Sequence, residues 1–284
     1  MAQASNFGGL PERYSNLKDS RIVIVPVPYD QTSTWIKGSD KGPAAIIEAS
    51  ANMELYDIET DSEVYLQGIF TDKPVTAVSS PEAMVESVRK RVWEHIRSGK
   101  WTVVVGGEHS VSIGSVRAYA ELNPGMTVLQ LDAHSDLRDE YNGSKYNHAC
   151  VMARIREICP ILQVGIRSMD SSEKGLLDRS RVFFAEDIQK RSNWIDEAVE
   201  KLSEKIYVTI DLDVFDSSMM PSTGTPEPGG LLWYEVMGFL KAVAEKKHIV
   251  GFDVVELCPD ERNKAPDFLA AKLIYKLLSY RFRG

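Results

Sequence analysis

Residues 126–136 read Met126-Thr-Val-Leu-Gln-Leu-Asp-Ala-His-Ser-Asp136, an apolar run followed at once by an Asp-x-His-x-Asp segment. Such a run is typical of a strand that is buried on both faces of a parallel sheet. Side chains two apart on a strand share a face, so continued strand geometry would project Asp132, His134 and Asp136 together. The stretch therefore predicts a parallel sheet with ionisable side chains at the carboxyl end of a strand.

A second acidic segment, Thr209-Ile-Asp-Leu-Asp213, follows another apolar run that begins at Ile206. Four carboxylates and an imidazole at the end of a hydrophobic sheet need a compensating charge. Two divalent cations would supply it, so the leading hypothesis is a dinuclear metal site that activates a water. Taken singly, each residue has a plainer interpretation, such as a helix-capping Asp or a surface His. Asp216 is interpreted as a residue that supports the ligands or forms a turn, and not as a ligand itself.

Strand-like and helical patterns alternate along the chain, which favours a mostly parallel sheet with helices on both faces. Further strands are expected at residues 21–28, 101–107, 161–166, 181–184 and 248–255, and helices at residues 81–93, 194–202, 234–243 and 264–280. Ligands of such sheets bind beyond the carboxyl ends of the strands. We expect one domain over residues 1–284, of which residues 1–20 form a polar extension.

The composition excludes several classes of protein. The chain has 284 residues and a net charge of −8, with acidic and basic residues mixed, so we expect no nucleic-acid partner. Its apolar runs are too short to span a bilayer and its first residues lack a signal-peptide core, so we expect no membrane association. Three cysteines without a CxxC pair indicate a reducing compartment. The expected location is cytoplasmic.

Gly106-Gly-Glu-His-Ser110 lies between an expected strand and an expected helix, where two glycines suit a tight turn. His109 then points into the space beyond the sheet. A strand-end His is more often an ordinary surface or core residue, but beside the two acidic segments His109 becomes a candidate ligand.

These motifs resemble those of the ureohydrolase family, which includes arginases and agmatinases. The matching segments, in the family's order and spacing, are residues 106–110, 132–136, 211–216 and 223–230, joined by 147–149 and 251–256. The resemblance covers nearly the whole chain and is specific because four separate motifs agree. It implies a three-layer, arginase-like α/β fold, hydrolysis of a C–N bond in a linear amidine, and a homo-oligomer, either a trimer or a hexamer.

The resemblance also implies a centre of two Mn²⁺ per subunit. The ligands that it carries over are His109, Asp132, His134, Asp136, Asp211 and Asp213, with Asp132 and Asp211 bound to both ions. Four carboxylates and two imidazoles favour Mn²⁺ over Zn²⁺. Glu256 is implied to accept the guanidinium N–H groups and His148 to give a proton to the leaving amine. On the residues alone, these two are a strand-end carboxylate and a loop histidine.

Agmatine is the expected substrate, cleaved to putrescine and urea in polyamine biosynthesis, because residues 136–149 look like the same segment in bacterial and archaeal agmatinases. Arg138 stands where arginases have an Asn and would favour a carboxylate-bearing tail, unless Asp139 or Glu140 neutralises it or it points away. The resemblance of the whole segment outweighs this single charge, so guanidinobutyrate, aminopropylagmatine and arginine rank behind agmatine. Two other classes stay open: a deacetylase with one Zn²⁺, and an inactive homologue that binds or regulates.

Overall fold

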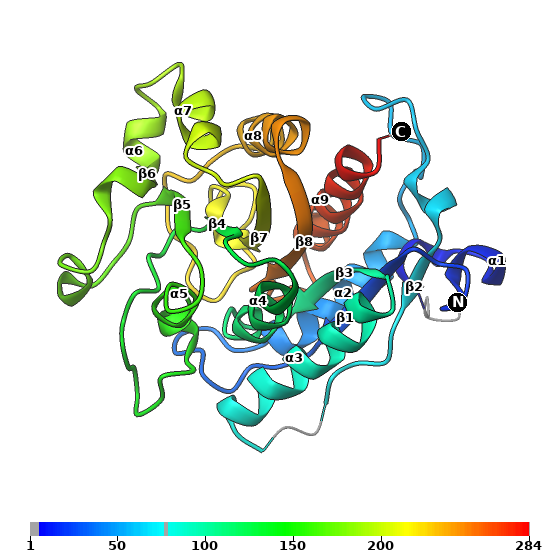
Figure 1. Ribbon diagram of the computed structural model, residues 1–284, viewed down its shortest axis with the longest axis horizontal. Helices are drawn as coiled ribbons and strands as arrows, with labels where there is room; N and C mark the ends of the chain where they lie inside the picture. Colours follow the sequence, from blue (N-terminus) through cyan, green and yellow to red (C-terminus); the bar gives the residue numbers. More distant parts are fainter. Residues whose placement is uncertain (1–5, 77–78, 284) are drawn as a thin grey trace.

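The computed structural model describes residues 6–76 and 79–283. Its centre is one sheet of eight parallel strands in the order β2-β1-β3-β8-β7-β4-β5-β6 (Figure 1). The strands are β1 (Ile22–Val27), β2 (Ile69–Thr71), β3 (Trp101–Gly106), β4 (Thr127–Leu131), β5 (Ile161–Ile166), β6 (Val182–Phe184), β7 (Lys205–Asp211) and β8 (His248–Val255). All strands but β2 were predicted. A three-residue edge strand is too short to give a sequence pattern.

Helices cover both faces of the sheet, which confirms the three-layer α/β fold. The α-helices are α1 (Glu12–Ser15), α2 (Gly42–Ser50), α3 (Pro81–Arg97), α4 (Val111–Leu122), α5 (Val151–Ile155), α6 (Ala185–Ile188), α7 (Trp194–Glu200), α8 (Trp233–Lys246) and α9 (Ala265–Arg281). Helices α3, α4 and α5 pack on one face, and α2, α7, α8 and α9 on the other (Figure 1). Each helical layer forms its own apolar core with the sheet.

Helix α3 illustrates how local sequence sets an element and its packing. The Ser80 hydroxyl accepts a hydrogen bond from the Ala83 N–H at 3.2 Å, and Pro81 occupies the first helical position. Such a cap satisfies a backbone donor that the first turn leaves unpaired. Met84 and Val88 recur at helical spacing and are fully buried in the core that α3 shares with the sheet.

The two glycines at the end of β3 are required because neighbouring atoms leave no space for a side chain. The predicted tight turn between strand and helix is present, since β3 ends at Gly106 and α4 begins at Val111. Neither glycine has a positive φ, so the turn uses the absence of a side chain and not a left-handed backbone. A Cβ on Gly107 would lie 2.0 Å from the Tyr29 carbonyl oxygen, and one on Gly106 would lie 2.5 Å from the Val111 side chain. The end of β3 therefore passes directly against the segment after β1, which brings His109 over the middle of the sheet.

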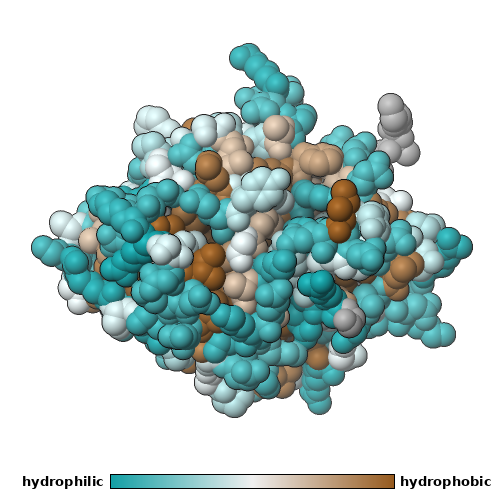
Figure 2. Space-filling view, turned by 90° about the horizontal axis from the view of Figure 1, so that it is seen from above, coloured by the Kyte–Doolittle hydropathy of each residue, from teal (hydrophilic) through white to brown (hydrophobic). Residues whose placement is uncertain are grey.

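Outside the sheet, Phe7 is fully buried in the core, so at least this residue of the predicted polar extension packs onto the domain. The single domain over residues 1–284 stays a prediction. No helix among the described residues has the length and apolarity needed to cross a membrane. Figure 2 shows a face on which hydrophilic residues predominate and hydrophobic ones lie in small separate groups.

Candidate metal centre

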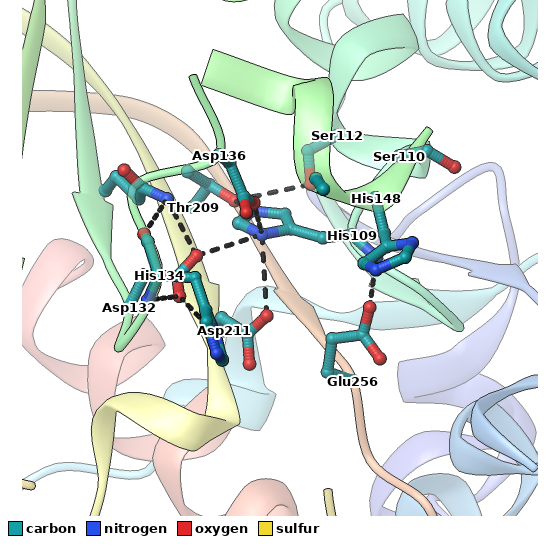
Figure 3. Close-up of polar contacts among 12 residues, drawn as sticks. His109, Ser110, Ser112, Asp132, His134, Asp136, His148, Thr209, Asp211 and Glu256 are labelled. Carbon is teal, nitrogen blue, oxygen red and sulfur yellow. Dashed lines mark hydrogen bonds and ion pairs between the residues drawn. The ribbon is translucent and has the colours of Figure 1, made fainter. Parts of the chain in front are cut away.

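All six predicted ligand side chains lie together beyond the carboxyl ends of three central strands. His109 follows β3, three residues follow β4, and Asp211 ends β7 with Asp213 just after it. Figure 3 shows His109 at the centre, with Asp132, His134 and Asp211 to one side and His148 and Glu256 to the other. The parallel sheet therefore gathers at one edge residues that are up to 104 positions apart, from His109 to Asp213.

The side chains form two adjoining groups. His109 Nδ1 lies 3.1 Å from Asp132 Oδ2, 3.1 Å from Asp136 Oδ2 and 3.4 Å from Asp211 Oδ2. His134 Nδ1 lies 2.9 Å from Asp213 Oδ2 and 3.6 Å from Asp132 Oδ1. In each of two triads the potential ligand atoms lie within 4.8 Å of one another, and both triads contain Asp132: His109–Asp132–Asp211 and Asp132–His134–Asp213.

Loop geometry, rather than strand alternation, brings the residues after β4 together. The strand ends at Leu131, and Asp136 adopts a φ of 52° in the left-handed region, so the strand geometry on which the predicted projection depended does not continue. Instead, Asp132 Oδ1 accepts the His134 N–H at 2.6 Å, which folds the segment back. Asp213 Oδ1 accepts the Ala133 N–H at 2.9 Å and ties this segment to the end of β7.

A buried hydrogen-bond chain determines which nitrogen of His109 faces the carboxylates. Thr209 Oγ1 donates to Asp253 Oδ1 at 2.6 Å, so it accepts from His109 Nε2 at 2.9 Å. The Nε2–H tautomer leaves the Nδ1 lone pair among three carboxylates, and this buried atom has no hydrogen-bond partner among the described residues. A lone pair facing carboxylate oxygens is repulsive without a cation between them, so the donor set fits a metal ion.

The electrostatics also fit a cationic occupant. Burial raises the pKa of Asp211 well above its usual value, and the nearby Asp213 and Asp132 raise it further. Burial and Asp132 raise the pKa of Asp136 to about 7. Burial alone would lower the pKa of His134, but Asp213 and Asp132 raise it to about 12. The site therefore attracts positive charge, which protons or divalent cations can supply.

Five of the six side chains, all but the fully buried Asp132, line a cavity of about 310 Å³ whose lining also includes both predicted catalytic residues. His148 begins a 3₁₀ turn (His148–Cys150) and is half-buried. Glu256 follows β8, is buried, and has a φ of 69°. Its Oε1 accepts the His109 backbone N–H at 2.7 Å, and burial followed by the charge of Glu108 raises its pKa. A carboxylate and an imidazole thus face the same space as the candidate ligands.

Arg138 lines the same cavity, near its rim. Its guanidinium stacks on the Tyr141 ring at 4.4 Å and lies 3.7 Å from Asp170 Oδ2. Asp139, one of the two expected neutralising residues, instead pairs with Arg154, whose side chain is buried. The partner of Arg138 therefore comes from a loop whose position near Arg138 no sequence pattern predicted.

Several polar residues that support the site were not predicted. Thr209 and Asp253 lie in β7 and β8, and Gln130 in β4 donates to Asp132 Oδ2 at 2.7 Å. All three are fully buried. The signal for them was a polar residue inside an otherwise apolar strand, because such a group must find a partner in the interior. Of the two predicted roles of Asp216, the structure shows the turn: its carboxylate accepts from the N–H groups of Ser218 and two glycines.

The chain is similar to ureohydrolases over almost its full length. An N(1)-aminopropylagmatine ureohydrolase of Synechocystis sp. is 39% identical, covering 95% of this chain and 92% of that protein. The agmatinase of Pyrococcus horikoshii is 32% identical over 94% of each chain. In the solved structure of the agmatine ureohydrolase of Thermoplasma volcanium, the match has a TM-score of 0.84 and 31% identity, covering 99% of this chain and 94% of that one.

The family assignment follows from these matches. Residues 20–279 match the Arginase family model. Relatives above 30% identity cover nearly the whole chain, and the fold agrees with a solved structure at 31% identity. The chain therefore belongs to the Arginase family and is a ureohydrolase, a hydrolase that acts on the guanidino C–N bond of a small molecule.

Proposed function

We propose that this ureohydrolase cleaves the guanidinium group of agmatine to putrescine and urea, with two Mn²⁺ held by the six gathered side chains. The observation that carries the proposal is the buried His109 Nδ1, which lacks a hydrogen-bond partner among the described residues and faces three carboxylates within 3.4 Å. Glu256 and His148 line the same cavity. Members of the Arginase family depend on two metal ions, which agrees with this donor set.

The proposed assignment of ligands is the one that the family resemblance implies, and it agrees with the presence of Asp132 in both triads. Asp132 and Asp211 would contact both ions, with His109 and Asp136 on one and His134 and Asp213 on the other. Oxygen-rich sites with imidazoles favour Mn²⁺ among the available divalent ions. When bound, the ions supply a water of lowered pKa as the nucleophile.

The protein's own groups hold the substrate and move the proton. Glu256 Oε1 is already occupied by the His109 N–H, which fixes the carboxylate in the cavity. Its oxygens then accept guanidinium N–H groups in a forked geometry that suits a planar cation. The departing amine must gain a proton, and His148 is the proposed donor because its imidazole lines the same space.

The rim supports a substrate with a cationic tail. The Asp170 carboxylate, 3.7 Å from Arg138, offsets the charge that would otherwise repel an ammonium. The contact of the Arg138 guanidinium with the face of the Tyr141 ring helps to hold it in the cavity lining. Agmatine therefore ranks above guanidinobutyrate and arginine, whose carboxylates would need an unpaired Arg138.

N(1)-aminopropylagmatine is the second candidate substrate, since two relatives of that activity are 39% and 37% identical to this chain. It has the same guanidinium end and a longer polycationic tail. Trp35 and Met169 line the cavity and are also exposed to solvent, so such a tail would continue outward along them.

Urea release from these four guanidino compounds, at one pH and with saturating Mn²⁺, tests the proposal. We expect the highest kcat/KM with agmatine. A tenfold preference for aminopropylagmatine would move the assignment to the second candidate, and the same preference for a carboxylate-bearing substrate would overturn the cationic-tail argument. No urea from any of them, with two metals bound, would favour the inactive homologue. One tightly bound metal would favour the deacetylase.

Three further expectations stay predictions: a cytoplasmic location, a place in putrescine and polyamine biosynthesis, and a trimer or hexamer of identical chains. Light scattering on the purified protein would measure the last of these.

A further inference from the structure

A threonine far from the sequence motifs contacts the proposed proton donor. Thr32 lies in the loop after β1, and its Oγ1 accepts the His148 backbone N–H at 3.0 Å. The same Oγ1 lies 3.3 Å from His148 Nδ1. One side-chain oxygen therefore meets both the backbone and the ring of a residue 116 positions away.

The single hydrogen of the Thr32 hydroxyl is already used. It is donated to Glu108 Oε1 at 2.6 Å. Thr32 Oγ1 is thus an acceptor toward His148, and the 3.3 Å contact is satisfied when His148 Nδ1 carries the hydrogen. A neutral imidazole protonated at one nitrogen has its lone pair on the other, which here is Nε2.

Glu108 fixes Thr32 in this role. It is fully buried, and Oε1 accepts from the hydroxyls of Thr32 and Ser110, while Oε2 accepts the Thr32 N–H at 2.6 Å and the Ser33 N–H at 3.0 Å. Four donors converge on this carboxylate from two segments. The loop that carries Thr32 is therefore tied to the turn that carries His109.

The ring of His148 is also held from its side. The Tyr141 ring meets it edge-on, with centroids 6.1 Å apart and an interplanar angle of 79°. With Nδ1 held by Thr32 and the ring in T-shaped contact with Tyr141, the orientation of the imidazole in the cavity is defined. Among residues 6–76 and 79–283, the polar contacts of the ring are those with Thr32.

We propose that Thr32, anchored by Glu108, is a positioning residue that keeps the hydrogen of His148 on Nδ1, so that Nε2 is the nitrogen that takes up and releases the proton. This inference rests on the proposed role of His148. Proton transfer to the leaving amine is efficient only when the donor nitrogen is correctly placed, so a ring free to rotate or change tautomer would lose rate without losing affinity.

The first test compares Thr32→Val with Thr32→Ser in the Mn²⁺-loaded enzyme. Valine keeps the volume but removes the oxygen, whereas serine keeps the oxygen and removes the methyl. We expect Thr32→Val to lower kcat by about 10- to 100-fold, with KM and bound metal unchanged, because only part of the general-acid contribution is lost. Thr32→Ser should retain most of the wild-type kcat. Equal losses in both variants would assign Thr32 to packing and overturn the proposal.

The second test reads the ring directly. In protein labelled with ¹⁵N-histidine, the His148 ring signals, identified by their loss in His148→Ala, should report hydrogen on Nδ1 in the wild type and in Thr32→Ser. Thr32→Val should show a shift toward the Nε2–H form. An unchanged tautomer in Thr32→Val would overturn the proposal whatever the activity.

A double-mutant comparison separates this inference from the proposed function. If Thr32 acts through His148, then Thr32→Val should cause no further loss of kcat in a His148→Ala background, whereas independent effects would multiply. Multiplying losses would overturn the positioning role. If His148→Ala alone keeps normal turnover, the proposed role of His148 fails, and the ring spectra still decide whether Thr32 sets the tautomer.

Discussion

His109 Nε2 lies 2.9 Å from Thr209 Oγ1, and the hydroxyl of Thr209 points its own hydrogen at Asp253. The two residues come from different strand ends, yet their contact decides the chemistry of the candidate centre. Because Thr209 acts only as an acceptor toward His109, the opposite ring nitrogen is left free to bind a cation. Groups that orient a ligating histidine in this way raise its affinity for metal.

Removing this hydrogen bond should weaken metal binding. We expect Thr209→Val to raise the Kd for Mn²⁺ by about 10- to 100-fold, since support of this kind contributes that much to metal affinity. Titration calorimetry on the metal-free protein measures the change. Thr209→Ser, which keeps the acceptor, is the matched control and should bind as the wild type does. Equal affinities for the valine variant and the wild type would show that the contact does not orient His109.

The two carboxylates proposed to contact both ions should be the most sensitive ligands. Asp132→Asn and Asp211→Asn should each lose at least one metal per chain, because an amide is a weaker, neutral ligand. Elemental analysis after gel filtration measures the stoichiometry. Two metals and near-normal turnover in either variant would contradict the ligand assignment.

His148 should affect turnover and not metal content. Replacement by alanine should lower kcat by about 10²- to 10⁴-fold, the range for loss of a general acid, with two metals retained. Added imidazole should restore part of the activity by entering the space left by the ring. Unchanged turnover would leave His148 as an ordinary loop residue.

The Arg138–Asp170 pair should set the preference for the substrate tail. Asp170→Asn leaves Arg138 without its partner, so kcat/KM should shift from agmatine toward 4-guanidinobutyrate by about tenfold, or 1.4 kcal/mol. Asp178→Asn is a suitable control. Asp178 accepts the Ser180 N–H in the same way that Asp170 accepts the Ser172 N–H, but Asp178 does not line the cavity. A ratio of substrates that stays constant in Asp170→Asn would show that the pair does not act on the tail.

Acid should remove one identifiable contribution to stability. Burial raises the pKa of Asp72, but hydrogen bonds from His95 and the Lys73 N–H and the charge of Arg91 prevail and lower it to about 2. A lowered carboxyl pKa stabilises the fold above the unfolded value near 4, and that stabilisation is lost as the pH falls toward 2. Asp72→Asn should therefore lower the free energy of unfolding at pH 7 by about 1 kcal/mol, after discounting for solvent screening.

Urea unfolding at pH 7 and pH 3 measures this effect. The difference in free energy of unfolding between the wild type and Asp72→Asn should be smaller at pH 3 than at pH 7. As a control, Glu200→Gln at an exposed position should change the free energy of unfolding little at either pH. A difference that is the same at both pH values would show that the ion pairs of Asp72 do not contribute.

Local sequence predicted most of the fold. Buried parallel strands need continuous apolar runs, and the runs at β1, β4 and β8 were visible without any partner strand. The start of α3 was equally visible, because Ser80 and Pro81 act on backbone groups within one turn. Edge strand β2 was not, since its three residues pair with β1 through backbone atoms that every sequence has.

The residues of the candidate site were also evident from the sequence, while their arrangement was not. Asp132 and Asp211 stand at the ends of apolar runs, and parallel strands place such ends at one edge of the sheet. The convergence itself depends on a backbone turn at Asp136 with a φ of 52°, which strand periodicity does not contain.

The sequence by itself determined the strands, the helices and the set of acidic and imidazole side chains, because these depend on periodicity and on chemistry within a few residues. Only the tertiary structure decided the partners: Thr32 for His148, Thr209 for His109 and Asp170 for Arg138. Each pair joins segments distant along the chain, and such contacts depend on how crossover connections order the strands and on how loops fold over their ends.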